Sequence, residues 1–203
     1  MRGQVPRDRK LTYEEFLAWC DEDTLAEWVD GEVLMLSPSS QRHEILRRFL
    51  ETVLGIFVEQ RALGLVLGGT FQMRLAEPVS SGRQPDVLFL AADRLSCLKE
   101  TYLDGPADLV VEIISPESRL RDRGEKFAEY ELGGVREYWL IDPERREADF
   151  YRQDARGRYR LAEPGPDGWY ESLVIPGLRL KVEWLWQVPP PKVLDVVREL
   201  GLP

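Results

Sequence analysis

The sequence predicts an α/β fold of the α+β type, in which helices flank a mixed central β-sheet. Two nearly uninterrupted apolar runs, residues 84–90 and 109–115, are typical of strands that are buried on both faces. Residues 39–62 carry apolar side chains at helical spacing, which predicts one long amphipathic helix. Because helices and strands follow one another along the chain, we expect a layered domain with additional antiparallel strands.

Composition indicates one globular domain over residues 1–203. Hydrophobic residues make up 43% of the chain and charged residues 31%, which excludes disordered and fibrous classes. No apolar run approaches the roughly 18 residues of a membrane span, so we expect a cytoplasmic protein with no membrane partner. Cys20 and Cys97 fit no zinc or redox spacing and are interpreted as buried or inert thiols.

The N-terminal half carries clear local signals. Thr12 and Glu15 form a capping box that predicts a short helix over residues 11–20. The dipeptide at 30–31, Asp-Gly, favours a tight hairpin turn between two strands in residues 25–37, with Glu27 on the first. The long helix over 39–62 is expected to end at Gly64. Residues 65–76 are rich in strand formers, with a bulge expected at 68–69.

The C-terminal half begins with a helix expected over residues 118–132. Leu120, Phe127 and Tyr130 share one broad face of it, and the glycine pair at 133–134 closes it. A buried strand is predicted over 135–141. Shorter strands are predicted at 148–153, 159–162 and 178–182, and a proline-rich turn and short terminal helix at 187–203.

One acid stands inside each of the two apolar runs, and this is the informative chemical feature. Asp86 and Glu112 would each be costly to bury alone, so each needs a partner, a metal or an edge position. Two such acids favour a shared cation. Because carboxylate oxygens are hard ligands and the chain has one histidine, Mg²⁺ or Mn²⁺ is expected rather than zinc.

Four ordered segments resemble a known family. Pro-Asp at 85–86, followed by an acid in the next apolar strand and then a lysine, resembles the PD-(D/E)XK nuclease superfamily of restriction-endonuclease-like folds. The bacterial Uma-two family of that superfamily is similar over residues 26–32, 84–87, 109–118 and 134–143. The resemblance spans about residues 11–185. It implies a restriction-endonuclease-like fold and a Mg²⁺- or Mn²⁺-dependent endonuclease that cleaves DNA. Because cleavage of both strands would need two such sites, a homodimer is also expected.

The resemblance also implies the site residues, with one departure. Asp86 and Glu112 match the metal-binding acids, and Glu27 matches an acid that assists the metal. The superfamily pattern places lysine two residues after the second acid, where this chain has Ile114. Lys126, on the following helix, is the expected replacement, positioning or activating the attacking water or neutralising the phosphate.

Each of these assignments has a plainer interpretation: Asp86 can be a turn cap, and Glu112 can belong to a structural ion pair. Lys126 can form a surface salt bridge with Asp122, one helical turn earlier. Glu27 can be an exposed strand residue. His43 precedes a glutamate, but position 47 is arginine, so the zinc-protease motif fails and a surface or capping role is preferred to one facing the cleft. Residues 115–118 can supply a hydroxyl group to the site or form the turn between strand and helix, and the turn is the preferred interpretation.

The balance of charge gives mixed signals about nucleic acid. A net charge of −9 argues against non-specific DNA binding, although a bound metal ion can offset it locally. The start of the 118–132 helix carries Arg119, Arg121 and Arg123. These arginines can contact phosphate groups, or they can form a solvated helix face with salt bridges, and the sequence favours neither interpretation. The arginine-rich stretch over 145–160, with Tyr151 and Tyr159 interleaved, suits backbone tracking or protection of edge strands. Trp184 and Trp186 are predicted to be core or interface residues.

Three functions are therefore compared. The leading prediction is a metal-dependent endonuclease acting on DNA. The alternative is a nuclease-fold nucleic-acid-binding or assembly module with weak or no activity, which the residue at position 114 and the acidic charge favour. A hydrolase of small phosphoesters shares the metal site but predicts no salt-dependent affinity for DNA.

Overall fold

A six-stranded mixed sheet forms the centre of the computed structural model, which describes residues 9–21, 24–115 and 118–202. Its strands lie in the order β11-β10-β9-β8-β6-β3. Their bounds are β3 Gly64–Gly68, β6 Val87–Ala91, β8 Leu109–Ile113, β9 Glu137–Asp142, β10 Glu147–Gln153 and β11 Tyr159–Leu161. Neighbours pair antiparallel except β8 and β9, which are parallel, so the predicted mixed sheet is confirmed.

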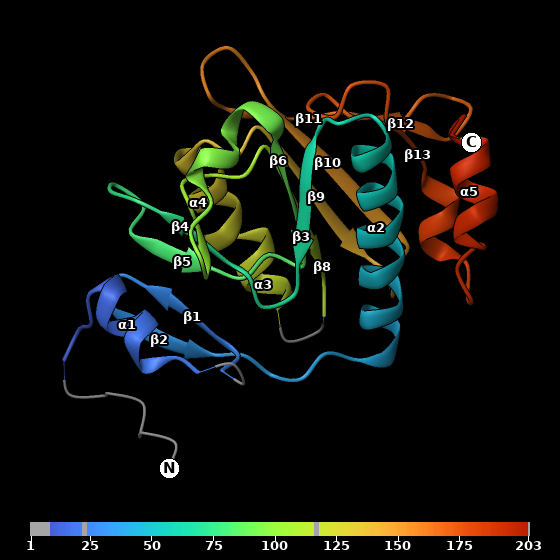
Figure 1. Cartoon of the computed structure of the whole chain (residues 1–203). Helices are drawn as coiled ribbons and strands as arrows, with labels where there is room; N and C mark the ends of the chain where they lie inside the picture. Colours follow the sequence, from blue (N-terminus) through green and yellow to red (C-terminus); the bar gives the residue numbers. More distant parts are fainter. Residues whose placement is uncertain (1–8, 22–23, 116–117, 203) are drawn as a thin grey trace.

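A second sheet of five strands lies beside the first, in the order β2-β1-β5-β4-β7 (Figure 1). Its strands are β1 Ala26–Val29, β2 Glu32–Met35, β4 Gln72–Leu75, β5 Ser81–Arg83 and β7 Tyr102–Asp104. The strands β12 (Trp169–Glu171) and β13 (Arg179–Lys181) form a separate two-stranded sheet. The predicted hairpin is present, with positive φ angles of 44° at Asp30 and 86° at Gly31.

Helices cover both faces of the six-stranded sheet (Figure 1). The helices of the described chain are α1 Tyr13–Trp19, which packs on the five-stranded sheet, α2 Gln41–Gln60, α3 Arg119–Arg123, α4 Glu125–Gly133 and α5 Val193–Glu199, with short 3₁₀ turns η1 Ala92–Cys97 and η2 Val182–Trp186. On one face, α2 buries Leu50, Leu54 and Phe57 against alternate residues of β6, β8 and β9. On the other face, Tyr130 of α4 packs against Tyr138 of β9.

The pairing register sets up the candidate site. Val87 pairs with Val111 where β6 runs antiparallel to β8, so the residue before β6 lies beside the residue after Val111. These two neighbours are Asp86 and Glu112. In the chain, α3 and α4 follow β8, and α3 begins at the end of the sheet where β8 ends (Figure 1).

Three local predictions need correction. Asp86 precedes β6 instead of lying in it, because the chain bends there before it enters the sheet. Residues 65–76 form strands of two different sheets, joined at Gly69, whose φ of 74° turns the chain out of the first sheet. The long helix ends at Gln60, and Gly64 begins β3 instead of capping the helix.

The predicted helix over 118–132 is two helices that meet at Gly124. Gly124 has φ −117° and ψ −86°, which is not helical, and a Cβ there would lie 2.8 Å from the backbone oxygen of Leu120. The break turns α3 relative to α4, and Leu120 is 90% exposed instead of sharing a buried face with Tyr130. The predicted close at 133–134 is confirmed, since Gly134 is left-handed with φ 90°.

The C-terminal segment is tied to the sheet by a buried acid. Glu137 of β9 is fully buried and accepts hydrogen bonds from the Ser172 hydroxyl, the Tyr170 hydroxyl and the backbone N–H groups of Leu173 and Val174. Trp184 is 4% exposed in the same core, as predicted. In the described part of the chain, no helix has the length and apolar character that crossing a bilayer requires.

Candidate active site

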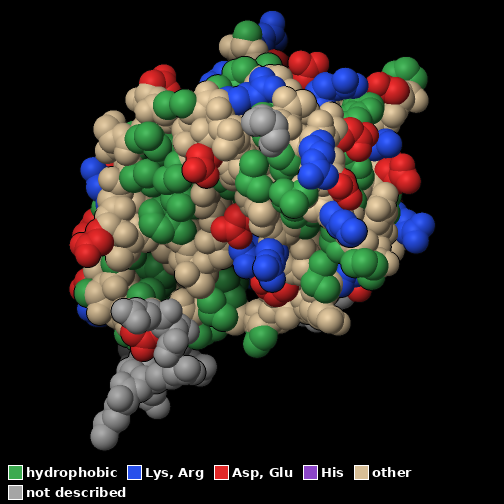
Figure 2. All heavy atoms as spheres, turned by 45° about the vertical axis from the view of Figure 1, so that its right-hand side comes forward, with side chains coloured by type: hydrophobic (Ala, Val, Ile, Leu, Met, Phe, Trp, Pro, Cys, Tyr) green, Lys and Arg blue, Asp and Glu red, His purple; other side chains and the backbone are tan. Residues whose placement is uncertain are grey.

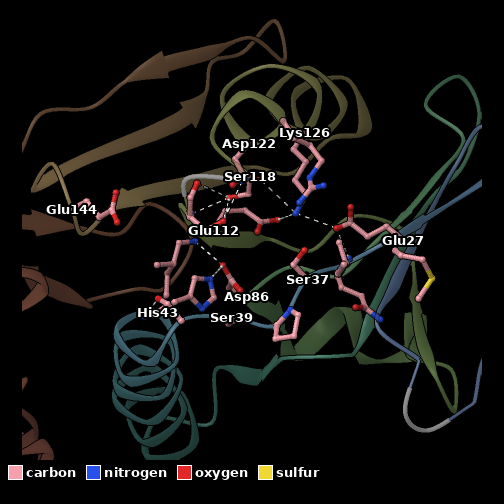
Figure 3. Close-up of a pocket in the computed structure, with 18 residues that line it drawn as sticks. Glu27, Ser37, Ser39, His43, Asp86, Glu112, Ser118, Asp122, Lys126 and Glu144 are labelled. Carbon is pink, nitrogen blue, oxygen red and sulfur yellow. Dashed lines mark hydrogen bonds and ion pairs between the residues drawn. The ribbon is translucent and has the colours of Figure 1, made fainter.

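A pocket of about 460 Å³ contains all four residues predicted for the site: Glu27, Asp86, Glu112 and Lys126 (Figure 3). They come from β1, from the bend before β6, from β8 and from α4. The loop after β2 and the first turn of α2 form another part of its lining. Segments far apart in the sequence therefore meet at this end of the central sheet.

Lys126 is the centre of a buried ion cluster, and this excludes the surface salt bridge as its only role. Its Nζ donates to Glu112 Oε1 at 2.8 Å and lies 3.1 Å from Glu27 Oε1 and 3.7 Å from Asp122 Oδ1. All four side chains are at most 4% exposed. The Tyr130 hydroxyl donates to the same Glu112 oxygen at 2.7 Å, so both α4 residues face the strand as their spacing predicts.

The charge of Lys126 is held in place by its neighbours. Burial opposes that charge, but Glu112, Glu27 and Asp122 outweigh burial and raise the pKa of Lys126 above its usual range. Burial raises the pKa of Glu112, because one ammonium is shared among several acids and cannot offset it fully. Lys126 is therefore a stable ammonium that donates hydrogen bonds.

Glu27 is fully buried, so its interpretation as an exposed strand residue is wrong. Arg83, also fully buried, donates from Nη1 to Glu27 Oε2 at 2.9 Å and from Nε to Glu129 Oε2 at 2.7 Å. Burial opposes ionisation of Glu27, but Lys126 and Arg83 prevail and lower the pKa of Glu27 to about 2. Glu27 thus carries a full negative charge that orients Lys126 from the side opposite Glu112.

Asp86 is fixed from two directions. Its Oδ2 accepts a hydrogen bond of 2.7 Å from the Ile113 backbone N–H and lies 3.2 Å from His43 Nε2. Asp86 makes no ion pair with Lys126 among the residues that the structure describes. Its link to the cluster is the hydrogen bond from the backbone N–H of Ile113, the residue after Glu112.

His43 faces the pocket instead of the surface. It is 7% exposed, and its Nδ1 is buried without a hydrogen-bond partner, although the Glu44 carboxylate lies 3.7 Å away. Burial opposes protonation, but the Asp86 carboxylate outweighs burial and raises the pKa of His43 above its usual value. The surface role preferred from the sequence is therefore wrong.

The donors present fit a hard divalent cation. Asp86, Glu112 and Asp122 line one pocket, and Asp122 Oδ1 is buried with no hydrogen-bond partner. Among residues 9–21, 24–115 and 118–202, no three acid, histidine or cysteine side chains are grouped closely enough to hold a metal by themselves. Mg²⁺ does not require such a cage, because it commonly keeps several waters and binds through one or two carboxylates.

The residues flanking the predicted turn at 115–118 support it. Ser115 N–H donates to the Ser118 hydroxyl at 3.0 Å, and Ser118 N–H donates to the Ser115 hydroxyl at 3.2 Å. Both serines also line the pocket. Pro116 and Glu117 lie outside the described residues.

The arginine-rich stretch over 145–160 does not form a basic aromatic track. Tyr159 is 7% exposed and packs with Tyr151 around Phe127, so the aromatic side chains belong to the core side of the sheet. Arg158 and Arg160 pair with acids. Figure 2 shows basic and acidic side chains interspersed on one face of the molecule, with no broad field of one sign.

Three residues of the site escaped sequence reasoning to different degrees. His43 falls on the buried face of α2 by helical spacing with Leu46 and Leu50, a signal that was present in the sequence. Asp122 lies four residues before Lys126, and this spacing also predicts that the two side chains are close. Arg83 ends a strand of three residues with no apolar pattern, and nothing local indicates its burial.

Comparisons with known proteins agree with the fold. The family model Uma2, described as "Putative restriction endonuclease", matches residues 13–183. No curated protein matches the chain. Among solved structures, a protein of Anabaena variabilis ATCC 29413, described as "a putative nuclease belonging to DUF820", is similar with a TM-score of 0.72. The two share 16% identity over 87% of this chain and 97% of that chain, which shows a common fold.

The matched region contains all three sheets and the whole pocket, and the nuclease-type fold agrees with that of the solved structure. The chain belongs to the Uma2 family of restriction-endonuclease-like proteins.

Proposed function

We propose that this protein is a Mg²⁺- or Mn²⁺-dependent endonuclease that hydrolyses DNA phosphodiester bonds in the pocket around Lys126. The observation that carries the proposal is the buried cluster in which Glu112, Glu27 and Asp122 surround the Lys126 ammonium, with Asp86 held beside Glu112. Lys126 reaches the cluster from α4. The site therefore contains a lysine even though Ile114 stands where the superfamily pattern places one.

Asp86 and Glu112 are the proposed metal ligands. A bound divalent cation supplies Lewis-acid polarisation of the phosphate and lowers the pKa of a water molecule. Asp86 is kept in position by Ile113 N–H and His43, which both contact its Oδ2 and leave Oδ1 for the metal. Fixing a carboxylate in this way reduces the reorganisation needed on binding.

Lys126 is proposed to bind and orient, not to act as the general base. A base must be deprotonated before it takes a proton, whereas the carboxylates around Lys126 raise its pKa above the usual range. Its Nζ instead donates hydrogen bonds toward a phosphate oxygen or the attacking water. Glu27, itself held by Arg83, keeps that ammonium in the pocket.

Cleavage of both DNA strands by a chain with one such site requires two copies, so the proposal includes a homodimer on DNA. Sedimentation of the protein with and without a DNA duplex measures this directly.

The test is nicking and linearisation of supercoiled plasmid in Mn²⁺ and in Mg²⁺. Wild type should cleave, EDTA should abolish cleavage, and Asp86→Ala and Lys126→Met should lose it. Asp93→Ala is the matched control, since Asp93 is exposed on η1 and does not line the pocket. Equal cleavage by wild type and Asp86→Ala would assign the activity to a contaminant. Metal-dependent DNA binding without cleavage would instead support a binding module.

A further inference from the structure

The three arginines of α3 differ sharply in their partners. Arg119 lies 2.9 Å from Asp142 and 3.6 Å from Glu144. Arg123 donates to Asp149 at 2.8 Å and lies 3.2 Å from Glu147. Both outer arginines are therefore paired with acids, and of these acids only Glu144 lines the pocket.

Arg121, the middle one, has no such partner. It forms no ion pair or side-chain hydrogen bond with the described residues; its Nε is buried without an acceptor, as are those of Arg119 and Arg123. Other arginines of the described chain that lack a polar partner, such as Arg48, Arg146 and Arg156, are exposed and solvated. Arg121 is half-buried, where an unsatisfied donor costs free energy.

Arg121 lines the candidate active pocket. Lys126, whose Nζ is proposed above to contact the cleaved phosphate or the attacking water, already has three acids within 4 Å: Glu112, Glu27 and Asp122. Arg121 is thus the guanidinium in this lining that remains available to an anionic ligand. Ser37 and Ser39, which also line the pocket, add hydroxyl donors on the loop before α2 (Figure 3).

We propose that Arg121 binds a phosphate of the DNA backbone next to the phosphate that is cleaved. The planar guanidinium can donate two parallel hydrogen bonds to the non-bridging oxygens of a phosphodiester. Such a contact fixes the register of the strand in the pocket and carries no base specificity. This inference rests on the proposed function, because it assumes that the cleaved group lies at Asp86 and Glu112.

A binding experiment separates the inference from the proposed function. Affinity for a short fluorescent DNA duplex is measured across a series of KCl concentrations in an Asp86→Asn background, which leaves the duplex uncleaved. Loss of one phosphate contact lowers the slope of log K against log salt by about 0.9. Arg121→Ala should show that decrease together with weaker binding, and Arg121→Lys should retain most of the slope.

Two control variants remove the same charge as Arg121→Ala at other positions. Arg123→Ala removes a neighbouring charge that is already paired on α3, and Arg156→Ala removes an exposed, unpaired charge in the loop between β10 and β11. Both should leave the slope unchanged. Arg121 forms no ion pair or side-chain hydrogen bond with the described residues, but its charge favours ionisation of Glu27 and Asp122, so its alanine variant should lower the thermal unfolding midpoint of its parent by much less than Lys126→Met does.

The kinetic arm uses cleavage-competent protein. A flanking contact stabilises ground and transition states alike, so Arg121→Ala should raise KM for DNA and leave kcat unchanged. An unaltered salt slope in Arg121→Ala, or a loss of kcat at constant KM, would overturn the assignment of Arg121. Cleavage by wild type would then still stand. Absence of salt-dependent binding in the parent protein would overturn both proposals.

Discussion

Replacing Lys126 by methionine tests the ion cluster, because methionine keeps most of the length of the side chain and removes its charge. The change leaves Glu27, Glu112 and Asp122 buried without the ammonium that they share. Removing one partner of a buried ion pair costs about 3–5 kcal/mol in the free energy of unfolding. For a chain of this size, each kcal/mol shifts Tm by roughly 2–4 °C, so we expect a decrease of about 6–20 °C at neutral pH.

The pH dependence of this loss has a definite sign. Without Lys126, the folded-state pKa values of the buried acids rise, so the variant loses stability above their unfolded values and regains it on acidification. In wild type, Glu27 has a folded pKa lowered to about 2, and its contribution is lost as pH falls toward that value. The difference between the two proteins should therefore shrink from pH 7.5 to pH 4.

Thermal and urea unfolding at several pH values measure the effect. Lys99→Met is the control, since Lys99 is exposed, and it should change the free energy of unfolding by less than about 0.5 kcal/mol. Added Mn²⁺ should restore part of the stability of Lys126→Met by neutralising the acids. A loss below about 1 kcal/mol that does not vary with pH would refute the charged, buried cluster.

The remaining predictions concern the same end of the molecule. Glu27→Gln should flatten the loss of stability between pH 4.5 and pH 2, as measured by acid titration of circular dichroism, because the depressed pKa of Glu27 is its source. Gly124→Ala should destabilise by about 1–3 kcal/mol, since its Cβ would meet a backbone oxygen at 2.8 Å, whereas Gly55→Ala on α2 should stabilise by about 0.5–1 kcal/mol. Leu120→Ser should change stability by less than about 0.5 kcal/mol because the side chain is 90% exposed; a large loss would contradict the break between α3 and α4.

Local sequence predicted those parts of the fold whose cause is local. The capping box at Thr12 and Glu15 and the left-handed pair at 30–31 involve residues within one turn of each other, and both are present. The acid of β8 was also predictable, because Glu112 interrupts an apolar run and the cost of its burial implies a partner.

Other features depend on contacts across the fold. The run at 65–76 has strand propensity throughout, but propensity does not say which sheet each strand joins, and β3 and β4 join different ones. Arg83 is buried only because Glu27 and Glu129 reach it from β1 and α4. The unequal roles of the α3 arginines likewise follow from where their acidic partners lie.

Anomalous diffraction from crystals grown with Mn²⁺ tests the central claim most directly, because it locates the metal without relying on activity. The proposed site predicts one strong anomalous peak within coordination distance of the Asp86 and Glu112 carboxylates, in the pocket that Lys126 lines, and its loss in Asp86→Asn. A peak bound elsewhere, or a pocket without manganese at saturating concentration, would contradict a metal-dependent nuclease site at these residues.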